Sequence, residues 1–248
     1  MSTDLKSIGL GFSTWQDAVE AAIASGALSV TGEVRGGQLI QFADRSGAQI
    51  NILAVEPFAT YAGFESVAQT YAHVDMLTDV VALCEIVDPL GNALATVTCN
   101  LAQGPLLAED GQQQFQPLAV TALGIETVVY PSAVDYENAT GDTVGTVLSD
   151  AARAVAEGSG GTAPDAGARF SARVLDAEYR TSELTGQRFI HATVDAAFPF
   201  DVCLPDNPVL PQRDEIIAGK AVLVASVKAP LGGGCCGGGG GSCGCGGH

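Results

Sequence analysis

The sequence predicts a mainly β protein of the α+β class, with an antiparallel N-terminal β unit, two flanking helices and a small C-terminal β barrel. Three observations support this class. Apolar and polar residues alternate in many short runs, turn residues separate these runs, and only two stretches show helical spacing. With 248 residues, of which 47% are hydrophobic, the chain can bury one large core or two small ones.

An amphipathic helix is predicted near the start of the chain. Apolar residues from Trp15 to Ile23 recur at positions i, i+3, i+4, i+7 and i+8, which is the spacing of one helix face. Ser13 is a suitable N-cap, because its hydroxyl can accept a hydrogen bond from a free backbone N–H of the first turn. Gly26 is expected to end the helix.

Strand patterns follow this helix as far as residue 130. The runs 38–43 and 48–55 flank the turn residues 44–47 and predict a β-hairpin. Residues 102–117 are predicted to form a long loop. Further antiparallel strands are expected at 72–77, 80–88, 93–99 and 118–130, the last as a strand pair or as one bent strand.

A domain boundary is predicted after the second helix, which is expected at 144–157. The following residues, 158–167, are rich in Gly, Ser, Ala and Pro, the composition of a flexible linker. We therefore assign residues 1–157 to an N-terminal α+β domain and residues 168–230 to a C-terminal domain.

The C-terminal domain is expected to be a small barrel. Strand runs at 168–180, 187–205 and 216–229 make up almost all of it. The second run is long enough to bend at Pro199, and Gly219 in the third indicates a bulge. A long first strand, a long coiled second strand and a third strand late in the sequence resemble the strand pattern of an OB fold, so we expect an OB-like barrel.

Composition and charge exclude several function classes. Twenty-eight acidic residues against eleven basic ones give a net charge of −17, which repels phosphate backbones, so no nucleic-acid partner is expected. No run of about eighteen apolar residues is present, so no membrane partner is expected either. The first residues lack a basic segment followed by an apolar one, and we expect a cytoplasmic protein.

The tail at 231–248, LGGGCCGGGGGSCGCGGH, carries the clearest chemical signal. It contains eleven glycines and no charged side chain, so it is expected to be disordered unless a ligand organises it. Thiolates and imidazole are the ligands that Zn²⁺, Cu(I) and Ni²⁺ prefer. The predicted metal ligands are Cys235, Cys236, Cys243, Cys245 and His248. Their spacing is neither a zinc-ribbon nor a ferredoxin pattern, since both of those use C-x2-C.

A family resemblance is confined to this tail. In composition, Cys235-Cys236-Gly237-Gly238 and Cys243-Gly244-Cys245 with the closing His248 are similar to the tails of bacterial SlyD-type prolyl isomerases, which handle nickel and zinc. The resemblance implies metal handling without isomerase activity, and the single tail histidine favours thiolate-loving ions over nickel. We expect a non-enzymatic metal-binding protein, in effect a metallochaperone, whose folded body recognises a partner protein.

Covalent modification is the alternative for the same segment. A Gly-rich stretch with Cys and Ser resembles the core of microcin-type precursors, in which these residues are cyclised to azoles. The folded body would then be a scaffold or oligomerisation module, able to form homo-oligomers, and the tail its attachment point. Thiol exchange, and a tail without any specific ligand, are further alternatives.

No catalytic residues are predicted from the rest of the chain. Cys84, Cys99 and Cys203 lie in apolar runs and are expected to be buried core residues. The chain contains no P-loop or HExxH motif, and no G-x-S-x-G motif before the Gly-rich tail.

The two remaining histidines are expected at the edge of the core or on the surface. His73 and His191 both lie in alternating strand patterns. His191, Cys203 and Asp195 have the residue types of a nucleophilic Cys-His-Asp system, but no local sequence signature supports such a site. These patterns favour a non-enzymatic protein; the alternative is an enzyme whose site lies in a cleft between the two units and does not need residues 231–248.

Overall fold

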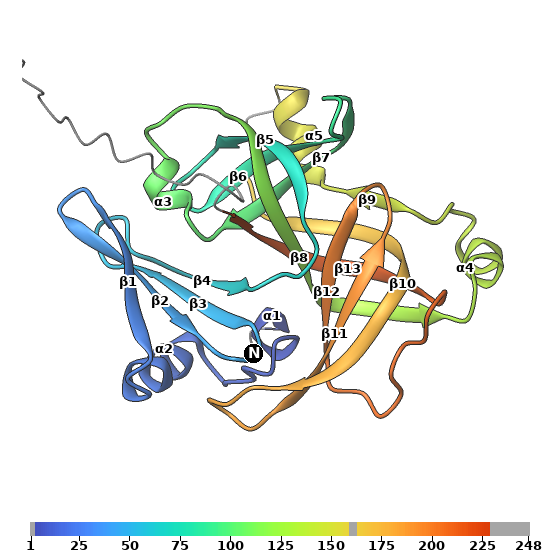
Figure 1. Ribbon diagram of the computed structural model, residues 1–248, viewed down its shortest axis with the longest axis horizontal. Coiled ribbons are helices and arrows are strands. Elements are labelled where there is room, and N and C mark those ends of the chain that lie inside the picture. The colour runs from blue at the N-terminus through green and yellow to red at the C-terminus, as the bar shows by residue number, and fades with distance from the viewer. Residues whose placement is uncertain (1–2, 159–162, 229–248) are drawn as a thin grey trace, which may run out of the picture.

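The computed structural model describes residues 3–158 and 163–228 and confirms a mainly β protein (Figure 1). A four-stranded antiparallel sheet has the order β1-β2-β3-β4. A nine-stranded mixed sheet has the order β11-β12-β8-β5-β6-β7-β13-β10-β9. The large sheet therefore takes strands from both sides of the predicted linker. The division into domains stays a prediction.

The small sheet consists of β1 (Leu28–Val34), β2 (Gly37–Ala43), β3 (Ala48–Leu53) and β4 (Ala59–Phe64). The large sheet consists of β5 (Thr70–Met76), β6 (Val81–Val87), β7 (Ala93–Leu101), β8 (Gln113–Tyr130), β9 (Thr146–Leu148), β10 (Gly167–Thr181), β11 (Arg188–Asp195), β12 (Pro199–Pro205) and β13 (Ile216–Val227). The helices are α1 (Thr3–Lys6), α2 (Trp15–Ala24), α3 (Gly104–Leu107), α4 (Ala133–Thr140) and α5 (Asp150–Ala156). No helix of this described part is long and apolar enough to cross a membrane.

The N-terminal helix is confirmed, with a different cap. Thr14, not Ser13, lies at the N-cap of α2, where its hydroxyl accepts the Asp17 N–H at 3.1 Å. The Asp17 carboxylate accepts the Thr14 N–H in return, also at 3.1 Å, which completes a capping box. The acid three residues after Thr14 decides between the two hydroxyl residues.

Two local predictions are wrong. The predicted loop at 102–117 contains α3 and the first residues of β8, which pair with β5 from Thr70↔Leu118 to Val74↔Gln113. The Gln-rich run there has no alternation, so only its partner strand makes it extended. The predicted helix at 144–157 is β9 followed by the shorter α5. Ser149 caps α5 by accepting the Ala152 N–H at 3.2 Å.

β8 and β13 lie at the centre of the large sheet. They pair antiparallel along the whole of β13, from Ile216↔Tyr130 to Val227↔Leu118. On its other edge β8 pairs with β5 and then with β12, while β13 pairs with β10 and β7. The pairings thus run in two closed orders, β5-β6-β7-β13-β8 and β8-β12-β11-β10-β13, which share these two strands.

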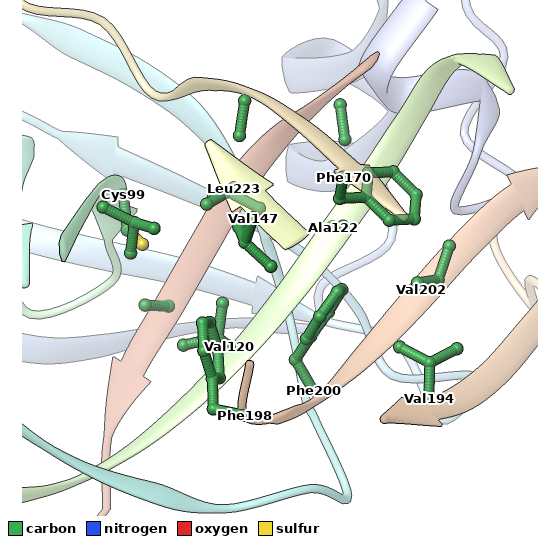
Figure 2. Packing of buried hydrophobic residues seen from close by; sticks show 14 of the residues in the cluster. Cys99, Val120, Ala122, Val147, Phe170, Val194, Phe198, Phe200, Val202 and Leu223 are labelled. Atoms are coloured by element: carbon green, nitrogen blue, oxygen red, sulfur yellow. The ribbon is translucent and has the colours of Figure 1, made fainter. Parts of the chain in front are cut away.

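The main core lies among the strands of the large sheet. Figure 2 shows Phe170 of β10, Phe200 of β12 and Phe198 meeting there. The Phe198 and Phe200 ring centroids lie 5.3 Å apart, and Phe170 meets Phe200 edge-on at 5.9 Å. A second cluster packs the small sheet and α2 against the large sheet, through residues such as Phe64 and Phe189.

A buried carboxylate also joins the two sheets. Asp44, in the β2–β3 turn, accepts the Ser182 hydroxyl at 3.1 Å and the Leu184 N–H at 3.0 Å, both from the β10–β11 turn. It also accepts the Ser46 N–H at 2.8 Å. Burial alone would raise the pKa of Asp44, but these hydrogen bonds to its charged form outweigh burial and hold the pKa below its usual value.

Acid is therefore expected to weaken the docking of the small sheet. Because the folded pKa of Asp44 lies below its usual 3.8, the stabilisation is present above that pH and lost as the pH falls through the folded value. Urea unfolding of the wild type and of Asp44→Asn should show a stability difference near pH 7 that shrinks below about pH 4. Glu126→Gln, which removes an exposed ion pair with Lys220, should change little at either pH. A difference that stays constant with pH would contradict this account.

Gly219 is required by the close contact between β13 and β8. Its φ is +149°, and the register shifts at the adjacent Lys220/Ala221 step, where the extra residue is Ile125 of β8; the bulge therefore lies in the partner strand, not at Gly219 as predicted. A Cβ at this position would overlap the carbonyl oxygen of Glu126 and lie 2.8 Å from the Thr127 Cα. Both neighbours are backbone atoms, so neither can move without opening the pairing.

Gly219→Ala should destabilise the protein by about 3 kcal/mol, because it adds this clash to the strain of a positive φ. Gly26→Ala is the matched control, since Gly26 has φ +69° and no atom lies within 4 Å of the point that its Cβ would occupy. It should cost only about 1 kcal/mol. Equal urea midpoints for the two variants would show that the contact is not limiting.

Candidate functional site

The predicted metal ligands, Cys235, Cys236, Cys243, Cys245 and His248, lie outside the described residues. The structure does define the point from which the tail starts. Val227 ends β13, and the side-chain amide of Gln103 donates to its C=O at 3.3 Å and accepts its N–H at 3.0 Å. The next N–H, that of Lys228, donates to the Pro117 carbonyl at 2.8 Å. The last described residues before the tail are therefore held by Gln103, at the start of α3, and by Pro117 of β8.

A cluster of metal-ligating side chains in the described part of the body could compete with the tail for a metal ion. Between residues 3 and 228, outside 159–162, no group of three or more His, Cys, Asp or Glu side chains could hold a metal ion. Any metal site made wholly from the described residues would need a different donor set.

The three core cysteines are buried and free, as predicted. A hydrogen bond with the Cys84 thiol, together with burial, raises the pKa of Cys99 well above its usual value. Burial raises the pKa of Cys203 in the same way, and the neighbouring Asp201 charge adds to the effect. Thiols with raised pKa values are protonated near neutral pH, so Cys99 and Cys203 are poor metal ligands and poor nucleophiles.

His73 is engaged by the backbone of β8. Its Nδ1 accepts the N–H of Phe115 at 3.1 Å, and the two rings meet edge-on with centroids 5.3 Å apart. Since Nδ1 accepts a hydrogen bond here, the ring carries its proton on Nε2. That nitrogen then has no lone pair to give to a metal ion. In this arrangement His73 supports the bulge of β8 at Phe115, where φ is +51°.

His191 lies in a buried polar network, not at the core edge. It is opposite Glu178 of β10 and Cys203 of β12, and its ring stacks on Phe64 at 5.5 Å. Its Nε2 lies 3.0 Å from a carboxylate oxygen of Asp201, and its Nδ1 lies 3.6 Å from Glu178. Both ring nitrogens thus face carboxylates.

Asp201 connects this network to the small sheet. Its two oxygens accept the N–H groups of Val67 and Ala68, at 2.6 and 3.2 Å, from the segment between β4 and β5. A carboxylate that accepts donors on both oxygens requires the His191 Nε2 to carry a proton. Next to it, the hydroxyls of Ser66 and Thr121 hydrogen-bond to each other.

The outer end of the network reaches the surface. Glu178 is half-exposed and accepts a hydrogen bond from the Arg180 Nε at 2.7 Å. That bond, with a smaller contribution from His191, holds the pKa of Glu178 below its usual value. Arg180 also donates to the Ser46 carbonyl at 3.1 Å, so the network meets the small sheet at a second point.

This arrangement can hold two sheets together but does not form a nucleophilic system. The partner of His191 is Asp201, not Asp195, whose side chain is exposed at the end of β11. Cys203 faces the same cluster, but its thiol is protonated and fully buried. A sequence signal for Asp201 was present. A single acid inside the apolar run FPFDVCLP needs a buried partner, and the opposite strand supplies it.

No family model, curated protein or solved structure matches the chain. Its function therefore has to be inferred from the chemistry of its own residues.

Asp201→Asn should lower the free energy of unfolding by about 3 kcal/mol, because an amide places a donor against the donors that the carboxylate now accepts. Thermal or urea unfolding measures the loss. Amide exchange at Val67 and Ala68 should speed up with it. Asp206→Asn is the control, because its ion pair with Arg188 is about half exposed and should be worth less than about 1 kcal/mol. Similar losses for the two variants would contradict a role for the buried network.

Proposed function

We propose that this protein binds a soft metal ion, Zn²⁺, Cu(I) or Ni²⁺, through its C-terminal tail. The ligands are drawn from Cys235, Cys236, Cys243, Cys245 and His248. One observation carries the proposal: four cysteines and a histidine occur within the last fourteen residues, separated almost entirely by glycine. Thiolates and imidazole select soft and borderline ions, and glycine allows a chain to wrap around an ion without steric cost.

The chemistry favours an ion that is held reversibly. Glycines lose much conformational entropy when a ligand orders them, which lowers the affinity of a Gly-rich site. Such a site suits storage or delivery better than permanent structural support. Because the thiols must lose their protons to bind, affinity falls as the pH drops.

The folded body supports this function by holding the start of the tail. Gln103 binds both backbone polar groups of Val227, and Pro117 accepts the N–H of Lys228. Any ion bound by the tail is thereby kept within one tail length of a fixed point. The buried core thiols have raised pKa values at Cys99 and Cys203, so they do not compete for it.

The body recognises a partner protein in the cytoplasm, to which the tail delivers its ion.

The strands of 168–230 form an OB-like barrel, a view supported by the β10–β11 and β11–β12 pairings. β8, which lies outside residues 168–230, would complete this barrel, because it pairs with both β12 and β13.

Mass spectrometry of the full-length protein should show a bound ion under native conditions, about one per chain, that acid removes. A variant with all four tail cysteines changed to Ser and His248→Ala should lose the ion. Ser242→Ala, which leaves every predicted ligand in place, should keep it. Metal affinity should fall by at least about tenfold between pH 7 and pH 5, since thiolate is the binding form.

The competing functions give different masses. A denaturing mass below the sequence value, located in the tail, would mean azole formation and would replace metal binding by modification. Unchanged metal content in the five-substitution variant would reject the tail as the site. If the body is instead a scaffold, size-exclusion chromatography should show an assembly that a chelator does not alter.

A further inference from the structure

An unpaired strand edge lies on β8, far from the start of the tail. On the edge that pairs first with β5 and then with β12, the last pairing of β8 runs from Thr121 to Leu123. From residue 124 to 130 no other described strand pairs with this edge, although the opposite edge is paired with β13 as far as Tyr130. In Figure 1 this half of β8 runs away from β12 toward α4. The open edge spans roughly 20 Å, enough for an added strand of six or seven residues.

Prolines keep the neighbouring chain out of this position. β12 ends at Pro205, and Pro208 and Pro211 follow before β13 begins. Proline has no N–H to donate and restricts the residue before it, so this segment cannot continue the ladder beside β8. The edge is therefore open because of the sequence of its neighbour, not because the chain is too short to cover it.

A groove runs along the open edge. It has a volume of about 560 Å³ and lies between β8 and the segment that links β12 to β13. Ile125, Thr127 and Val129 contribute one wall, as expected for alternate residues on one face of a strand. Ile125 and Val129 are exposed by 38% and 40%. Ile190 and Leu204, from the edge of the main core, also line the groove.

The charged residues that line the groove are all acidic. Glu126, Asp206 and Glu215 line it, and no Lys or Arg does. Lys220 and Arg188 lie nearby, but each is already paired, with Glu126 and Asp206 respectively. Glu215 accepts only a backbone N–H, that of Gln212. Among the described residues, Glu215 is therefore the acid of the groove that has no cation beside it, and a basic side chain of a bound segment would be attracted chiefly to this carboxylate.

We propose that this edge binds an extended basic peptide segment of another protein, by adding it as a strand to β8. Its main chain would take up the free N–H and C=O groups of residues 124–130. Its apolar side chains, at every second position, would lie against Ile125 and Val129. Lys or Arg residues at the other positions would reach the acidic rim. The assignment rests on the proposed partner recognition by the body and does not involve the metal.

The acidic groove favours a basic segment of another protein over two other occupants, a second copy of the chain and the chain's own tail. A second copy of the chain also carries −17 and would bring a second set of acids to the edge. The chain's own tail has no charged side chain. Neither brings an excess of positive charge to Glu215.

The probe is an acetylated and amidated heptapeptide that alternates valine with lysine. Titrated into the full-length protein, it should slow amide hydrogen exchange within residues 124–130. A peptide N-methylated at alternate positions has the same side chains and cannot complete the ladder, so it should give no protection. Ile125→Lys should weaken binding by at least about tenfold, while Leu90→Lys, at an exposed turn position, should change it by less than about twofold.

A second variant covers the case in which Ile125→Lys is unstable. Glu215→Lys leaves the apolar wall intact and reverses one charge, so it should weaken the lysine peptide and strengthen a peptide with glutamate in place of lysine. No protection by the lysine peptide, equal binding of the N-methylated peptide, or equal affinity of Glu215→Lys for both charge types would overturn the proposal. Protection in the peptide-free protein that disappears on dilution would assign the edge to a second copy instead.

The proposed metal site and the proposed peptide site can be tested separately. The variant without tail ligands should bind the lysine peptide as the wild type does. If it binds the peptide but no metal, both assignments stand. If the wild type binds metal but no peptide, only the strand-addition site is rejected.

Discussion

The pairing of β8 with β13 is the constraint on which the rest of the structure depends. Each strand uses both edges, so the two closed pairing orders of the large sheet share these two strands. The main core is packed between strands of both closed orders. Opening this ladder would expose core residues on both sides at once, so the glycine at position 219, where a Cβ would overlap the backbone of β8, protects the whole sheet.

The small sheet is attached by hydrophobic packing and positioned by two buried carboxylates. Asp44 belongs to the small sheet and accepts donors from the large one, while Asp201 belongs to the large sheet and accepts N–H groups from the segment that leaves β4. Hydrophobic contact has no preferred direction, whereas a buried charge without its donors is costly. The two carboxylates therefore define one orientation among those that packing alone would allow.

Local signals in the sequence predicted local structure. The helix at α2 and the hairpin of β2 and β3 were predictable, because apolar spacing and turn residues act within a few positions. The first part of β8 was not predictable, because its Gln-rich residues are extended only through pairing with β5. The partner of His191 was missed for the same reason: Asp201 lies on the next strand, and only the register of β11 and β12 brings the two together. The predicted metal ligands depend on composition alone, which indicates the donor types and leaves their geometry undefined.

An exposed strand edge is a hazard that proteins normally cover, shorten or charge. Here β8 is left open for several residues beside apolar side chains, and the surrounding acids supply the protection. They lie where another copy of the same edge would have to approach, so self-pairing brings like charges together. Under the proposed strand addition, the same negative charge that would oppose the pairing of two copies would attract a basic strand. Glu215, which has no cation beside it in the described part of the chain, would contribute to both effects.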